Sequence, residues 1–117
     1  MKDIPTIIKK PWGQEELIEK NDRYMVKKLT MLSGHKCSLQ YHKEKRETIY
    51  VLSGKLNIYT GRDKNFLEVK EYEAGDNITI PPGLIHRMEG VEECTYLEAS
   101  TPEIEDVVRL VDDYNRA

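Results

Sequence analysis

The stretch between two glycines, Gly34 and Gly54, constrains this chain more than any other part of its sequence. Within it, Gln40 and His42 stand two residues apart, so a single strand would point both side chains to the same side. Glu47 follows after a four-residue loop, where a neighbouring antiparallel strand would begin. The spacing therefore predicts two adjoining strands that bring three polar side chains to one place.

A second stretch begins at Gly75 and adds His86, just after a Pro-Pro-Gly turn that would direct its side chain. Two imidazoles, a carboxylate and an amide oxygen form a mixed nitrogen and oxygen set, which suits Mn, Fe, Co, Ni or Zn. Open positions would remain for water or substrate. A single histidine on a strand is more often an ordinary polar side chain. Here, however, two glycine-framed stretches each supply histidine at a regular spacing, which favours a metal site. We expect Gln40, His42, Glu47 and His86 to bind one divalent metal ion.

Most of the remaining chain consists of short segments with β-forming composition, separated by turns. The expected strands are 15–19, 24–32, 36–42, 48–52, 55–60, 66–72, 77–80, 86–88 and 94–99. Residues 1–14, with two prolines and the single Trp12, are expected to form an extended arm that ends in a turn. About eight to ten short strands of this kind predict an all-β sandwich or barrel.

The C-terminal residues 100–117 have a different pattern, with apolar residues at roughly helical spacing. These residues are Ile104, Val107, Val108, Val111 and Tyr114. Ser100 would cap such a helix, with Glu103 three residues further on and Pro102 in the first turn. The pattern predicts a short C-terminal helix.

Length and charge limit the class of protein. A chain of 117 residues favours a single domain. Its 18 basic and 21 acidic residues are interspersed, whereas a nucleic-acid-binding protein would cluster its basic residues. No apolar run approaches the ~20 residues of a membrane span, and residues 1–13 lack the apolar segment of a signal peptide. We therefore expect a cytoplasmic protein that binds neither nucleic acid nor membrane, with Cys37 and Cys94 as buried thiols.

The two glycine-framed stretches together resemble the two motifs of the cupin family, G-x5-H-x-H-x4-E-x6-G and G-x5-P-x-G-x2-H-x3-N. Every spacing agrees. The chain departs from the motifs at Gln40, which replaces the first histidine, and at Gly90, which stands where asparagine is expected. The resemblance implies a cupin double-stranded β-helix, a jelly-roll barrel with its metal inside.

A narrower resemblance extends over nearly the whole chain. It is similar to the C-terminal cupin domain of the bifunctional mannose-1-phosphate guanylyltransferase / mannose-6-phosphate isomerases. The matching residues are 11–13, 38–40, 42, 80–87 and 106–109, with Asp112, Tyr114 and Arg116. That family also has glutamine at the first ligand position, so Gln40 fits, whereas Ile49, Gly90 and Asn115 depart from the family's Trp, Asn and Gly. The family's nucleotidyltransferase half is absent, so no guanylyltransferase activity is expected.

The resemblance implies isomerisation of a sugar phosphate between aldose and ketose forms, through an enediol. That reaction needs a general base of tuned pKa near the reacting carbons. Glu98, on the last expected strand, and Lys36, on the face that carries the ligands, are the catalytic candidates. Each also has a simpler interpretation as an ordinary polar or surface side chain.

A phosphate group would require cations, because guanidinium and ammonium groups bind phosphate well. The candidates are Lys28, Arg87 and Arg109, although strand alternation would point Arg87 away from the metal. Arg109 has an alternative role in anchoring the tail through a salt bridge.

Two other functions remain open, a non-catalytic sugar-binding or regulatory cupin and a metal-dependent dioxygenase. We also expect a homodimer, because a short barrel has edge strands to cover.

Overall fold

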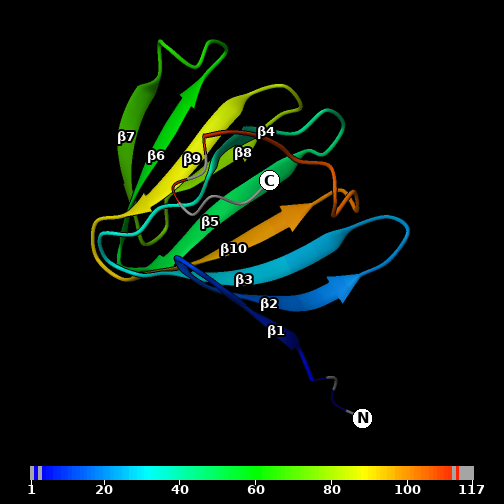
Figure 1. Ribbon diagram of the computed structural model, residues 1–117. Helices are drawn as coiled ribbons and strands as arrows, with labels where there is room; N and C mark the ends of the chain where they lie inside the picture. The colour runs from blue at the N-terminus through cyan, green and yellow to red at the C-terminus, as the bar shows by residue number, and fades with distance from the viewer. Residues whose placement is uncertain (1, 3, 112, 114–117) are drawn as a thin grey trace.

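Eleven strands make up the regular structure of residues 2, 4–111 and 113, which are the residues described by the computed structural model. They are β1 (Thr6–Lys10), β2 (Gly13–Lys20), β3 (Met25–Met31), β4 (Leu39–Tyr41), β5 (Glu47–Ser53), β6 (Lys55–Gly61), β7 (Glu68–Glu73), β8 (Asn77–Ile80), β9 (Ile85–Gly90), β10 (Cys94–Ser100) and β11 (Val108–Val111). They form two antiparallel sheets, in the orders β1-β2-β3-β10-β5-β8 and β11-β4-β9-β6-β7. Figure 1 shows the two curved sheets side by side around a common interior.

The side chains that fill the interior change from apolar to charged along the strands that line it. On β3 and β10 the paired residues Met31 and Cys94 are buried and apolar. Further along the same two strands, Lys27 and Glu98 are paired and are also buried. Because side chains on one face of a strand recur every second residue, all four point into the barrel. One end of the interior is therefore an apolar core and the other carries charges.

The prediction of an all-β fold is confirmed, and the nine expected strands overlap β2 to β10. Part of the expected N-terminal arm forms β1, which pairs with β2 at the edge of the six-stranded sheet. Trp12 lies in the turn between them and is buried in the core. Among residues 2, 4–111 and 113 there is no helix with the length and apolarity that a membrane span requires.

The predicted C-terminal helix is wrong for the residues that the structure describes. Residues 101–107 form turns and irregular structure, and β11 follows as a strand paired with β4. Two of the apolar residues that suggested a helix, Val108 and Val111, are β-branched and suit a strand. The open edge of β4 supplies the backbone partner, so sheet pairing outweighs the helical spacing. Tyr114 lies outside the described residues.

Gly54 shows why the first motif ends in glycine. Its φ of +77° is in the left-handed region, and a Cβ atom at this position would lie 2.0 Å from the carbonyl oxygen of Glu93. The tight turn from β5 to β6 therefore passes directly against the start of β10. This close approach lies at the apolar end of the barrel, next to the buried Cys94.

Candidate metal centre

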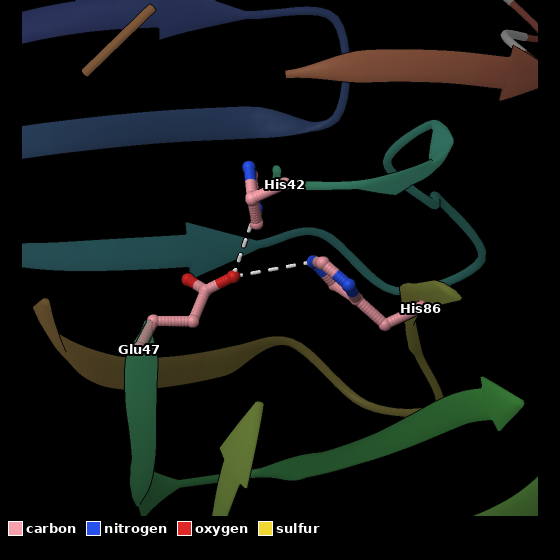
Figure 2. A group of neighbouring side chains, drawn as sticks. All are labelled: His42, Glu47 and His86. Atoms are coloured by element: carbon pink, nitrogen blue, oxygen red, sulfur yellow. Dashed lines mark hydrogen bonds and ion pairs between the residues drawn. The ribbon is translucent and has the colours of Figure 1, made fainter. Parts of the chain in front are cut away.

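Three side chains from different strands meet inside the barrel: His42, Glu47 and His86, here called the metal trio. His42 directly follows β4, Glu47 is the first residue of β5, and His86 lies in β9. Figure 2 shows one Glu47 oxygen between the two imidazoles. This Oε1 atom lies 3.0 Å from His42 Nε2 and 3.2 Å from His86 Nε2. The potential ligand atoms of the trio are all within 4.8 Å of one another, and all three residues are buried.

Both histidines are oriented by backbone carbonyls. His42 donates from Nδ1 to the carbonyl oxygen of Asp106, and His86 donates from Nδ1 to that of Leu84 at 3.0 Å. A carbonyl oxygen only accepts hydrogen bonds, so in each ring the proton of the neutral imidazole is on Nδ1. Each Nε2 therefore directs a lone pair toward Glu47, and this arrangement of the second ring nitrogen is typical of metal-binding histidine.

The trio fits a metal ion because its lone pairs otherwise face one another. Glu47 Oε2 and His86 Nε2 are buried and have no hydrogen-bond partner among the described residues. Buried polar atoms of this kind need a partner, and two neutral imidazoles beside a carboxylate offer only acceptors at the point where they meet. A divalent cation would satisfy all three, and nitrogen and oxygen ligands suit Mn, Fe, Co, Ni or Zn.

Gln40, the fourth ligand expected from the sequence, lies on β4, the strand that precedes His42. It is the Cα partner of His86 where β4 and β9 pair, and it lines the same pocket as His42 and Glu47. Its Oε1 atom accepts a 2.6 Å hydrogen bond from the hydroxyl of the buried Ser38. The amide oxygen thus has the Ser38 hydroxyl as its hydrogen-bond partner.

His42 and Glu47 of the trio line a cavity of about 210 Å³ whose wall is partly charged and partly apolar. Lys10, Lys27, Lys45 and Arg109 line it as cations. Its carboxylates are Glu15, Glu47 and Glu98. A small polar molecule in this cavity would therefore meet charged groups of both signs next to the metal trio.

Lys45 and Glu98 form a buried ion pair beside Glu47. Lys45 Nζ lies 3.5 Å from Glu98 Oε2 and 4.0 Å from Glu47 Oε2. Burial raises the pKa of Glu98 to about 8, and the adjacent charge of Glu47 acts in the same direction. Burial also opposes ionisation of Glu47, but its close contacts with His42, His86 and Glu98 hold its pKa well below the usual value. Of the two neighbouring carboxyl groups, Glu98 is therefore the one that retains a proton at higher pH.

The other candidate residues from the sequence fall into two groups. Arg109 lines the cavity together with Glu98, whereas Lys28, Lys36 and Arg87 are not among the residues that line it. Lys28 and Arg87 directly follow Lys27 and His86, which point inward, so strand alternation turns them to the outer faces. The ammonium of Lys36 and the guanidinium of Arg87 each lie 3.5 Å from the carboxylate of Asp113.

Sequence reasoning missed Lys27, Lys45 and Asp106. Lys27 had a detectable signal, since it occupies an inward position between Met25 and Leu29 on an otherwise apolar strand face. Lys45 and Asp106 lie in irregular segments, where spacing does not predict the direction of a side chain. Only the folded chain shows that both contact the region around the metal trio.

Comparison with known proteins identifies the family. The family model described as Mannose-6-phosphate isomerase C-terminal matches residues 2–111. The chain belongs to this family. Mannose-1-phosphate guanylyltransferase of Escherichia coli (strain K12) is 31% identical over 117 residues, and xanthan biosynthesis protein XanB of Xanthomonas campestris is 29% identical over 117 residues. Each match covers 92% of this chain but only 22% and 23% of the relatives, so the chain spans about a fifth of their length.

Solved structures confirm the cupin jelly-roll fold. KdgF of Halomonas sp. superposes with a TM-score of 0.72 at 16% identity, over 83% of this chain and 86% of that protein. CapF of Staphylococcus aureus superposes with a TM-score of 0.75 at 22% identity, over 93% of this chain and 32% of that protein. Oxalate decarboxylase of Bacillus subtilis, a protein with Mn(II) centres, superposes with a TM-score of 0.75 at 21% identity, over 89% of this chain and 29% of that protein. At these identities the likeness concerns the fold alone.

Proposed function

We propose that this protein is a metal-dependent isomerase of a sugar phosphate, similar in activity to mannose-6-phosphate isomerase. The observation that carries the proposal is that His42 and Glu47 of the metal trio line a cavity that also holds the buried pair Lys45 and Glu98. Membership of the Mannose-6-phosphate isomerase C-terminal family supports the choice of reaction. Gln40, His42, Glu47 and His86 would hold one divalent ion, which would polarise the sugar oxygens and stabilise negative charge on them.

The residues around the trio suit the proton transfer. Isomerisation removes a proton from the carbon next to the carbonyl and returns one to the former carbonyl carbon, through an enediol. Glu98 is the proposed base, because Glu47 is committed to the metal while Glu98 lies next to it in the cavity. Lys45, 3.5 Å from Glu98, lowers the pKa of Glu98 and so favours the ionised form that a base requires, against the burial that raises this pKa.

The cavity also suits an anionic substrate. Its four cations include Arg109 on β11 and Lys10 on β1, which come from the last and first strands. Guanidinium and ammonium groups are suitable partners for a phosphate. We propose these two residues for phosphate binding. Of the substrate-binding residues suggested by the sequence, only Arg109 remains part of the proposal.

The proposal predicts conversion of mannose 6-phosphate to fructose 6-phosphate by the metal-loaded protein, and loss of that turnover after chelation. A coupled assay of fructose 6-phosphate with Zn²⁺, Mn²⁺, Co²⁺, Ni²⁺ or Fe²⁺ tests it. Tight binding of the sugar phosphate without turnover would contradict the isomerase and support a non-catalytic sugar-binding protein. Iron-dependent consumption of oxygen would instead indicate an oxygenase.

We also propose a homodimer that uses the edge strand β1. This strand has only one neighbour, β2, and edge strands expose backbone groups that pair with other chains. Ile7 on β1 and Ile18 on β2 are 55% and 44% exposed. Ile7→Glu is expected to convert a dimer to monomers in light scattering, whereas Val69→Glu on β7, an edge strand of the five-stranded sheet, should leave the dimer intact. A monomeric wild type, or a dimer unaffected by Ile7→Glu, would exclude this interface.

A further inference from the structure

We infer that the segment 101–111 is a working part of the metal centre and that Asp106 is its positioning residue. The inference rests on the proposed function, because it concerns the metal site on which that function depends. Figure 1 shows this segment, orange to red, running from the end of β10 back to β4, the strand that precedes His42. The residues 43–46, here called the ligand loop, connect His42 to Glu47.

One side chain organises the backbone of this loop. The carboxylate of Asp106 accepts hydrogen bonds from the backbone N–H groups of Lys43, Glu44 and Lys45, at 3.0, 2.7 and 2.9 Å. Three consecutive donors on one carboxylate fix the path of the loop, since charge-assisted bonds of this kind are stronger than neutral ones. These three hydrogen bonds also explain why the pKa of Asp106 lies below its usual value, and the bond from the Glu44 N–H is the largest cause.

The same residue orients a ligand. The backbone carbonyl of Asp106 accepts the hydrogen bond from His42 Nδ1 that directs Nε2 toward Glu47. Asp106 therefore holds both His42 and the first three residues after it. Partners that fix the second nitrogen of a metal-binding histidine set its orientation and its strength as a ligand.

Contacts on either side of Asp106 keep it in place. Thr101 and Arg46 exchange two hydrogen bonds of 3.0 Å, which join the start of the segment to the end of the ligand loop. At the other end, β11 pairs with β4, and Arg109 is the Cα partner of Gln40. The segment is thus attached to the chain on both sides of the loop, next to three of the four proposed ligands.

The position of Lys45 follows from this arrangement. Lys45 belongs to the ligand loop, yet its side chain is buried with Nζ 3.5 Å from Glu98. Its backbone N–H is one of the three that Asp106 binds. Loss of the Asp106 carboxylate would free the loop to shift, which would move both a metal ligand and the lysine of the cavity.

The test measures metal affinity and site geometry in full-length variants. Asp106→Ala is expected to lower the affinity for Zn²⁺, measured by chelator competition, about 10- to 100-fold. It should also alter the visible absorption of the Co²⁺-loaded protein and speed hydrogen exchange at the amides of residues 43–45. Asp106→Asn keeps one acceptor oxygen and should fall between Asp106→Ala and wild type. The control is Asp76→Ala, which removes a carboxylate that accepts the N–H of Glu73 at a distant turn, and it should leave all three readouts unchanged.

The outcomes separate this inference from the proposed function. A wild type that takes up neither Zn²⁺ nor Co²⁺ overturns the metal centre itself. Wild-type affinity and Co²⁺ absorption in a folded Asp106→Ala protein overturn the role of Asp106 while leaving the metal centre in place. If Asp106→Ala does not fold, Asp106→Asn decides in the same way, because unchanged affinity and absorption in that variant would contradict the inference.

Discussion

Replacing either histidine of the metal trio with alanine is expected to abolish binding of a divalent ion. His42 and His86 each direct one Nε2 toward Glu47, and removing one leaves too few strong ligands around the carboxylate. The loss should exceed the 10- to 100-fold that is typical for residues that only support a ligand. Elemental analysis after equilibration with Zn²⁺ should find about one ion per chain in the wild type and none in His42→Ala or His86→Ala.

The matched control for these variants is His35→Ala. His35 is the only other histidine of the chain, and its ring contacts the carbonyl oxygen of Ser33 away from the trio. Metal that binds only the native state stabilises it, so chelation should lower the melting temperature of wild type and His35→Ala but not of the two trio variants. Equal metal content in His86→Ala and His35→Ala would refute the trio as the binding site.

The trio was predictable from two local patterns taken together with the resemblance to the cupin motifs. Gln40 and His42 lie on one side of a strand through simple alternation, and Glu47 begins the next strand after a loop of fixed length. His86 is distant in sequence, so its meeting with them depended on the resemblance between both stretches and the cupin motifs. The structure brings His42, Glu47 and His86 together as expected.

The surroundings of the trio were less predictable, because they depend on packing over long sequence distances. Asp106 contacts the ligand loop more than 60 positions away, and it lies in a segment whose apolar spacing suggested a helix. Lys36 was assigned to the ligand-bearing face, but β4 begins only at Leu39, so regular alternation does not extend back to it. Local spacing thus identified candidate ligands, whereas the groups that orient them could be recognised only in the folded chain.

The origin of the candidate ligands would give a bound metal ion a structural role as well. Glu47 belongs to the six-stranded sheet, whereas Gln40 and His86 belong to the five-stranded sheet. A bound ion would therefore connect the two sheets at the charged end of the barrel, where apolar packing is replaced by Lys27 and Glu98. This connection is the structural reason to expect that chelation lowers the melting temperature of the wild type but not of the two histidine variants.

Glu98→Gln is expected to lower kcat for the sugar phosphate about 10²- to 10⁴-fold, which is the usual contribution of a positioned general base. Glutamine has nearly the same shape, and its amide oxygen can still accept the bond from Lys45 Nζ, so the fold should persist. Metal content should also stay at the wild-type level, because the metal trio is intact. The change should thus separate proton transfer from metal binding, in contrast to the histidine variants.

The control for Glu98→Gln is Glu89→Gln, on the outer face of β9, where the carboxylate accepts a 2.8 Å bond from the hydroxyl of Tyr59. It makes the same chemical change outside the cavity and should leave kcat unchanged. A Glu98→Gln protein with wild-type kcat would show that Glu98 is not the base. In that case Lys45→Met becomes the decisive variant, because the buried Lys45 ammonium also lies beside Glu47. Loss of turnover in Lys45→Met would assign the proton transfer to Lys45.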